Sequence, residues 1–241
     1  MPSSQRMSST VTYRPENLDA KKLHGCLLGA IAPRPIAFVS TVDAQGRVNL
    51  APFSYFNVFS ANPPLVVFSP ARRGRDATTK HTWDNVQEVR EVVVNLVDHA
   101  LVNACSLAST DFAQGVDEFV KAGLTAVPSE AVCPPRVAES PVQLECNVVK
   151  LESLGEQGGA GQLVFAEIVR MHFRDDVLNS VGVPDATKLD LVGRCGGDHY
   201  VRVHGDALFT VPKPLGVMGM GVDGLPEDIR MSRVLTGNHL A

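Results

Sequence analysis

A tight turn between two strand-like stretches is the feature that most limits what this chain can fold into. Residues 36–42 (IAFVSTV) are rich in β-branched and aromatic side chains, and a second strand begins near Val48. Between them, Asp43 and Gly46 belong to the sequence DAQGR, in which glycine suits the positive φ of a hairpin turn. The sequence therefore predicts a β-hairpin at this point.

Further strands follow the hairpin, and most of them are joined by short connections. Residues 65–69, 91–97, 142–154 and 162–173 are predicted strands, and glycine-rich residues 155–161 separate the last two. Residues 91–97 are apolar enough to be buried on both faces. No G-x-G-x-x-G motif follows a strand, which disfavours a Rossmann domain. The pattern predicts a mainly β fold with inserted helices (α+β), most simply a β-barrel decorated by helices.

Three helical segments are predicted, one before the first strand and two between later strands. Asn17 or Asp19 can cap a helix that ends at Gly29, before the prolines at 33 and 35. Residues 76–88 indicate a loop that leads into a short helix. Residues 99–122 have apolar side chains at near-helical spacing and should be mostly helical up to Gly123.

Composition excludes several classes of protein. With 241 residues the chain can form one domain with extensions, and its net charge of −4 provides no basic excess for nucleic acid. No apolar run has membrane-spanning length, so no membrane partner is expected. The five cysteines are scattered without a C-x-x-C pair, which favours reduced thiols in a cytoplasmic protein. Residues 1–15 are expected to be disordered.

Chemical motifs for hydrolysis or metal binding are not found. No serine lies in G-x-S-x-G, and no cysteine has the local signature of a cysteine hydrolase. His81, His199 and His204 do not form a metal-ligand pair of the H-E-x-x-H type. We therefore expect no catalytic side chain and no metal site.

A basic, hydroxyl-rich segment begins at Ser69 and ends at Thr82. It carries Arg72, Arg73, Arg75 and Lys80 and leads into the predicted short helix, whose first N–H groups favour an anion. One interpretation is a phosphate site. The other is that the arginines are solvated loop charges and that Thr82 only caps the helix.

A second polar segment, residues 49–57 (NLAPFSYFN), interrupts what should be a strand. Small residues and Pro52 lie between aromatic side chains, so a flat ring could lie against the backbone and bind to N–H groups and the Ser54 hydroxyl. The alternative is an edge strand with a bulge, in which Pro52 cannot donate a hydrogen bond and Phe53 and Phe56 belong to the core.

An ordered series of short motifs connects these segments over about residues 18–205. In this series the chain resembles the flavin reductase-like FMN-binding split-barrel family, in the branch that includes the flavoredoxins. The matching motifs are residues 32–41 (APRPIAFVST), 49–57, Pro63-Pro64 with Ser69, Lys80-His81-Thr82 with Asn85, Val93-Val94-Asn95, Asp117-Glu118-Phe119 with 122–124 (AGL), 140–142 (SPV) with 144–146 (LEC), and Gly193-Arg194 with Gly196-Gly197 and Tyr200.

The resemblance implies a Greek-key split β-barrel that forms a homodimer and holds FMN near the subunit interface. Residues 16–205 would form this domain, and residues 206–241 would be a C-terminal extension. Three alternatives stay open for the extension: it packs on the partner subunit, it caps the flavin groove, or it is a loosely ordered surface segment. By position in the motifs, the isoalloxazine and ribityl would contact Asn49, Ala51, Pro52, Phe53, Ser54 and Tyr55, and the phosphate would contact Ser69, Lys80 and Thr82, with Arg75 as an addition. Two departures are His81, where the family usually has Asp, and Cys195, where an aliphatic residue is more common.

The resemblance also implies a function. We expect an FMN-dependent oxidoreductase that takes hydride from NAD(P)H onto flavin and passes electrons to an acceptor such as free flavin, iron or a partner oxygenase. In such a reaction the cofactor carries the chemistry and the protein positions the rings. Two alternatives stay open: a flavoredoxin-like FMN electron carrier without nicotinamide turnover, and a binding module that kept the barrel without the flavin.

Overall fold

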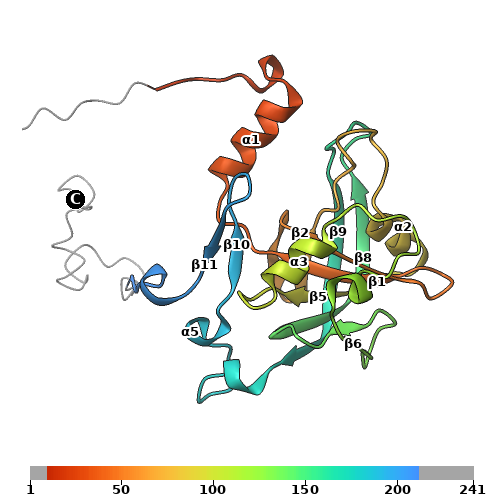
Figure 1. The fold of residues 1–241 in the computed structure, drawn as a ribbon, viewed down its shortest axis with the longest axis vertical. Helices are drawn as coiled ribbons and strands as arrows, with labels where there is room; N and C mark the ends of the chain where they lie inside the picture. Colours follow the sequence, from red (N-terminus) through yellow and green to blue (C-terminus); the bar gives the residue numbers. More distant parts are fainter. Residues whose placement is uncertain (1–9, 212–241) are drawn as a thin grey trace, which may run out of the picture. The chain divides into compact units, whose positions relative to one another are not determined.

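A computed structural model describes residues 10–211 of the chain (Figure 1). Residues 10–204 lie in one compact unit, and of the second unit the structure describes residues 205–211, which include a 3-10 turn at Gly205–Ala207. The predictions for residues 1–9 and for 212–241 fall outside the described part. Within that part, no helix combines the length and apolar character needed to cross a membrane.

The centre of the first unit is a seven-stranded sheet in which every neighbouring pair is antiparallel. This confirms the predicted mainly β fold with inserted helices. In spatial order the strands are β2 (Val48–Phe53), β1 (Ala37–Val42), β5 (Glu91–Leu96), β8 (Val142–Ser153), β9 (Gln162–Phe173), β4 (Pro64–Phe68) and β3 (Phe56–Ala61).

The two edges of this sheet are joined by only two residues, Ser54 and Tyr55, which connect β2 to β3. A chain rises at most about 3.5 Å per residue, so the sheet must curl until its edges come near each other. The backbone N–H of Ser69, just after β4, donates to the Tyr55 carbonyl at 2.9 Å and fixes this link. The sheet is thus a barrel that stays open between β2 and β3.

The predicted hairpin is confirmed, with Val42 opposite Val48 and a φ of 77° at Gly46. The alternative interpretation of residues 49–57 is correct in part. β2 is an edge strand, and Phe53 is buried and stacks on Phe68 with ring centroids 5.7 Å apart. The pairing of β2 with β1 runs without a bulge, however, and the segment contains the end of one strand and the start of another.

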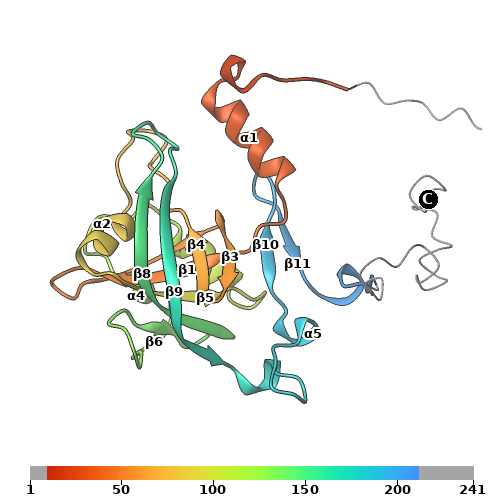
Figure 2. The ribbon, with the colours of Figure 1, turned by 180° about the vertical axis from the view of Figure 1, so that it is seen from behind.

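The helices lie outside the sheet, and Asp19 caps the first of them by accepting from the Lys22 N–H at 2.7 Å. α1 (Ala20–Ala30) stands beside the small hairpin of β10 (Val192–Arg194) and β11 (Tyr200–Arg202) (Figures 1 and 2). Gly196 of that hairpin packs so closely there that a Cβ would lie 3.0 Å from the Cα of Gly29. The helices are α1 (Ala20–Ala30), α2 (His81–Glu88), α3 (Val102–Ala108), α4 (Glu118–Ala122), α5 (Ala186–Leu189) and the 3-10 turns Pro15–Asn17 and Asp175–Val177; the short strands are β6 (Ala126–Val127), β7 (Arg136–Val137), β10 (Val192–Arg194) and β11 (Tyr200–Arg202).

Two details of the helix predictions were wrong. Residues 109–117 leave the predicted helix because the Ser109 hydroxyl donates to the Ser106 carbonyl and a new helix starts only where Asp117 caps it. Thr82 does not cap α2, since Lys80 holds the N-cap position and Thr82 is the second residue of the helix, almost fully buried.

Side chains of β1 point alternately into two separate clusters of buried apolar residues. Ala37 and Val39 belong to the cluster inside the curled sheet, while Phe38 belongs to a second cluster under α3 and α4. Leu50 on β2 is fully buried in this second cluster. α3 and α4 therefore clamp the outer face of β2 and fix the strand that carries the polar segment.

Candidate functional site

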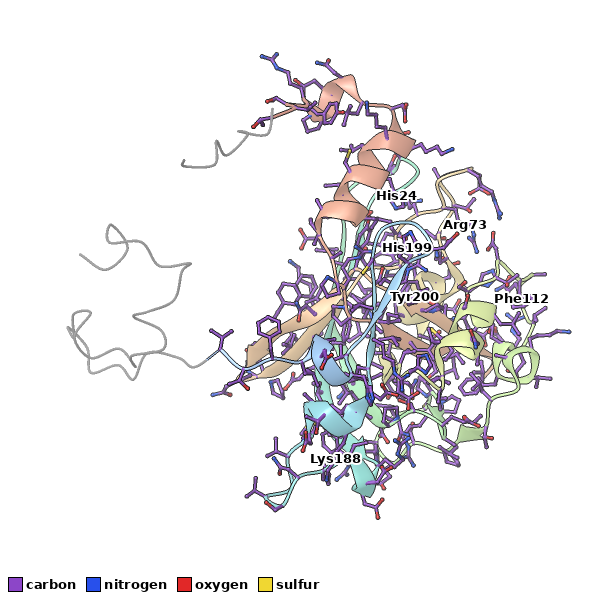
Figure 3. All side chains as sticks on the ribbon, turned by 60° about the vertical axis from the view of Figure 1, so that its left-hand side comes forward. His24, Arg73, Phe112, Lys188, His199 and Tyr200 are labelled. Carbon is purple, nitrogen blue, oxygen red and sulfur yellow. The ribbon has the colours of Figure 1, made fainter. Side chains whose placement is uncertain are left out.

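A cleft of about 780 Å³ lies where the polar segment and the basic segment meet. This volume is within the usual range of small-molecule sites, about 300–1,000 Å³. His24, Arg73 and Phe112, which line it from three separate segments, are labelled in Figure 3. All ten residues predicted for the site line this cleft: Asn49, Ala51, Pro52, Phe53, Ser54, Tyr55, Ser69, Arg75, Lys80 and Thr82.

One hydrogen bond connects the two predicted segments directly. The Asn49 side-chain amide donates to the Thr82 hydroxyl at 3.0 Å, and both residues are buried. Asn49 comes from β2, while Thr82 comes from the first turn of α2. Two segments that lie 33 residues apart thus form one continuous polar wall.

Ser69 is buried at the end of β4, where its hydroxyl oxygen accepts from the backbone N–H of Gln162 at 3.0 Å. Since a hydroxyl has one proton and two lone pairs, Ser69 still has its own proton to donate to a ligand. Gly158 belongs to the β8–β9 connection on the same side, and a Cβ there would lie 2.8 Å from the Gly74 carbonyl oxygen. The connection therefore presses directly on the basic loop.

The arginines of the basic segment have different tasks. Arg72 donates to the carbonyls of Ala77 (2.9 Å) and Gly155 (3.2 Å) and so ties the loop to the β8–β9 connection. Arg73, whose side chain is only 15% exposed, pairs with Asp111 at 2.9 Å and also donates to the Thr79 carbonyl. These two are structural, so they are not the solvated charges of the alternative interpretation.

Arg75 fits that alternative better, because its side chain is 67% exposed. It pairs with Asp76 at 3.1 Å and also with Asp111. The sequence prediction assigned Arg75 to the phosphate and gave Arg73 no separate role, although Arg73 also lines the cleft and is better enclosed.

Lys80 is a half-buried cation of the cleft, and its Nζ lies 5.5 Å from the centre of the Phe53 ring. Burial lowers the pKa of Lys80, and repulsion from Arg73 lowers it further, while Asp111 opposes both. Among the described residues no carboxylate forms an ion pair with Lys80. An anion in the cleft would restore favourable surroundings to this charge.

Two walls of the cleft were not predicted. One is the face of α1 with Lys21, His24 and Leu28, and the other is the loop 109–112 together with Glu118. Neither carries a local pattern that indicates a ligand. Glu118 lies in a motif that the family resemblance contains, but that motif gave no role to the residue.

Arg34 connects the α1 wall to the polar segment. It is buried, and its guanidinium donates to the carbonyls of Leu28 (2.7 Å) and Ile31 at the end of α1 and to the carbonyl of Cys195 (3.2 Å). Its Nε also lies 3.4 Å from the Ser54 hydroxyl. Because only the backbone of Cys195 takes part, the unusual cysteine at this position leaves the network intact.

A family model described as "Flavin reductase like domain" matches residues 29–186, about two thirds of the chain. The chain belongs to the flavin reductase-like family. This confirms the resemblance, and with it a flavin-linked oxidoreductase class.

Individual relatives agree with the family assignment. An uncharacterised protein of Halalkalibacterium halodurans is 39% identical over 83% of this chain and 95% of its own length. Component B of the nitrilotriacetate monooxygenase of Bacillus cereus is 31% identical, with a TM-score of 0.79 over 85% of this chain and 100% of that chain. A Shewanella frigidimarina structure described as a flavin reductase with a split-barrel domain is 24% identical and has a TM-score of 0.70. The match covers 83% of this chain and 96% of that chain, and it confirms the split-barrel fold.

The donor set of the cleft fits the flavin that the family implies. The cleft is lined by hydroxyls and cations, from Ser69, Thr82, Lys80 and Arg75, as a phosphate requires. It is also lined by aromatic and small residues along β2, against which a planar ring can lie. Which of these residues contact a flavin stays a prediction.

Proposed function

We propose that this protein binds FMN in the cleft and acts as an NAD(P)H-dependent oxidoreductase of the flavin reductase type. The observation that supports this most strongly is the Asn49–Thr82 hydrogen bond. It joins the polar segment, where the ring would lie, to the basic segment, where the phosphate would lie, in one continuous wall. A ligand with a flat ring at one end and a phosphate at the other matches that wall.

The phosphate would be held by Ser69, Lys80 and Thr82, with Arg75 at the rim and Arg73 behind them. A terminal phosphate carries close to two negative charges, and it suits Lys80, which forms no ion pair within residues 10–211 and lies in the same cleft as Arg73 and Arg75. This supports FMN in preference to FAD, whose phosphates are bridged and not terminal.

The ring and ribityl would lie along Asn49, Ala51, Pro52, Phe53, Ser54 and Tyr55. Because β2 is an edge strand, a ring can lie along its free side, where the Leu50 N–H is already bonded to Glu118 and the Ser54 hydroxyl can donate to the ring. A bound flavin supplies the hydride-accepting chemistry, and the residues of this chain orient it, shield one face and hold its phosphate. No side chain is required as an acid or base.

The similar Bacillus cereus protein is component B of a monooxygenase, which favours a partner oxygenase as the acceptor of the electrons. We also propose a homodimer in the cytoplasm. Exposed apolar side chains on β3 and β9 support self-association, among them Phe59 at 67% and Met171 at 56% exposure.

The decisive experiment is an absorption spectrum of the purified protein, followed by anaerobic addition of NADH and then NADPH. We expect a flavin band at about 450 nm that bleaches with at least one nicotinamide. A stable flavin band that neither nicotinamide bleaches would contradict the reductase and leave the FMN electron carrier. Colourless protein that fails to bind added FMN would contradict flavin binding altogether.

A further inference from the structure

A buried carboxylate lies in the wall of the cleft and has no part in the proposed phosphate site. Glu118 is the first residue of α4, is 5% exposed and lines the cleft beside β2. The helix is capped by the neighbouring Asp117, whose carboxylate accepts from the N–H of Phe119. Glu118 is therefore not needed as the cap, and its position in the cleft requires another explanation.

The carboxylate of Glu118 completes the free edge of the sheet. Its Oε2 accepts from the backbone N–H of Leu50 at 3.0 Å. Leu50 lies on edge strand β2 and pairs only with Ser40 of β1, so a side-chain oxygen occupies the place where a neighbouring strand would offer a carbonyl. Glu118 thus fixes the segment between Asn49 and Ala51, both of which line the cleft.

The negative charge of Glu118 is not balanced by a neighbouring cation. Among the described residues it forms no ion pair, and its surroundings include the apolar Leu50 and Phe119. In such surroundings a unit charge acts over a longer distance than it does in water. A ring bound along β2 would therefore be exposed to this charge.

From this geometry we propose that Glu118 is a positioning residue that holds the ring-binding part of β2 and lowers the reduction potential of the flavin bound there. This inference rests on the proposed function. Two-electron reduction of oxidised flavin with uptake of one proton leaves one additional negative charge on the ring. A fixed carboxylate beside the ring disfavours that product.

Protonation of Glu118 should remove the effect. Burial raises the pKa of Glu118, and nearby Asp117 adds to this, while the Leu50 N–H opposes it. On α3, burial raises the pKa of Cys105 to about 12, so this thiol stays neutral at moderate pH. The other titratable or charged groups that line the cleft are Lys21, His24, Tyr55, Arg72, Arg73, Arg75, Lys80, His81 and Asp111.

The test is the midpoint potential of the FMN-loaded protein, measured by spectroelectrochemistry for the wild type and for Glu118→Gln. The amide keeps an oxygen that accepts from Leu50 but has no charge. We expect a more positive potential, equivalent to roughly tenfold tighter binding of reduced relative to oxidised FMN. The difference should shrink as the pH falls and the wild-type carboxylate becomes protonated.

Asp117→Asn is the matched control, because it removes the same charge one residue away, at an exposed position that does not line the cleft. Asparagine is as good an N-cap as aspartate, so α4 should persist. We expect this variant to keep the wild-type potential. A shift as large as that of Glu118→Gln would mean that any charge on α4 suffices and would overturn the assignment.

A second measurement needs no substitution at all. By linkage, if Glu118 disfavours reduced flavin, then reduced flavin must raise the pKa of Glu118. Carbon-13 NMR titration of the Glu118 carboxyl in the wild type, with FMN oxidised and then reduced, measures this. If the protein binds FMN but the pKa of Glu118 is the same with oxidised and reduced flavin, this inference alone is overturned. The same holds if the midpoint potential of bound FMN is unchanged in Glu118→Gln. Wild-type protein that binds no FMN overturns the proposed function as well.

Discussion

The side-chain amide of Asn49, on edge strand β2, donates to the hydroxyl of Thr82, in the first turn of α2, at 3.0 Å. Both groups are buried, and each comes from a segment with a different composition, one aromatic and one basic. The bond holds these segments at a fixed distance before any ligand arrives. A ligand that contacts both segments therefore meets a wall that is already formed, and its binding orders few side chains.

Lys80 should contribute the largest single share of phosphate binding. Replacement by methionine keeps the apolar stem over Phe53 and removes the charge, and a charge-assisted hydrogen bond contributes about 1.5–3 kcal/mol. We expect the FMN dissociation constant to rise roughly 10- to 100-fold. Fluorescence titration of apo-protein with FMN measures it.

Lys150→Met is the control for that experiment. Its Nζ also lies near a phenylalanine ring, 5.1 Å from the centre of Phe165, but it is exposed and pairs with Glu152 outside the cleft. We expect unchanged FMN affinity. Equal losses in the two variants would show that the lysines act through general charge, and the phosphate site would have to be placed elsewhere.

Much of this fold could be predicted from local sequence, because hairpins and buried strands have short-range signals. The turn at Gly46 and the buried strand β5 are examples. β3 escaped prediction because it is an edge strand whose Val58 and Phe59 are exposed, so it shows neither an apolar run nor clean alternation. The end of the helix at Ser109 depends on one local side-chain bond that competes with the helix.

The candidate site also has parts that the sequence predicted and parts that it did not. The segments that could carry a ligand were visible as unusual composition, and the family resemblance joined them. The α1 wall and Glu118 were not visible, because they reach the cleft only through long-range packing. Glu118 meets Leu50 over a separation of 68 residues, and Arg34 meets Cys195 over 161.

Arg34 should hold α1 against the body of the protein. Arg34→Met leaves the carbonyls of Leu28, Ile31 and Cys195 without their donor, and loss of a buried charged donor costs about 2–4 kcal/mol. We expect a lower free energy of unfolding and faster hydrogen exchange over residues 20–30. Arg47→Met, which removes a half-exposed ion pair with Asp43, should cost no more than about 1 kcal/mol. Unchanged exchange in α1 would refute the role of Arg34.

The contact between the β8–β9 connection and the basic loop can be tested with a methyl group. A Cβ at Gly158 would lie 2.8 Å from the Gly74 carbonyl oxygen, so Gly158→Ala must push the two loops apart. We expect weaker FMN binding with a small change in stability, because both loops are at the surface. At Gly155 a Cβ meets only the side chain of Ala160, at 3.5 Å, so Gly155→Ala should bind FMN as the wild type does. FMN affinity that is equal in both variants would argue against a ligand between these loops.

Stability at low pH should depend on Glu145, which is fully buried and accepts from the N–H groups of Glu130 (2.9 Å) and Ala131 and from His172 Nε2 (2.7 Å). Burial alone would raise the pKa of Glu145, but these donors outweigh it and the pKa is lowered. A carboxyl whose folded pKa lies below its unfolded value of 4.5 stabilises the protein above that value. The stabilisation is then lost as the pH falls through the lowered folded pKa.

Glu145→Gln should therefore be less stable than the wild type at pH 7, by about 1–3 kcal/mol, since the amide keeps one acceptor oxygen and loses the charge. The difference should become smaller as the pH falls below 4.5 and the wild-type carboxyl becomes protonated in turn. Urea unfolding at a series of pH values measures both quantities. Glu152→Gln, at an exposed ion pair, should follow the wild-type curve. A stability difference between Glu145→Gln and wild type that stays constant from pH 7 down to acid would show that shape and packing, not charge, make this residue important.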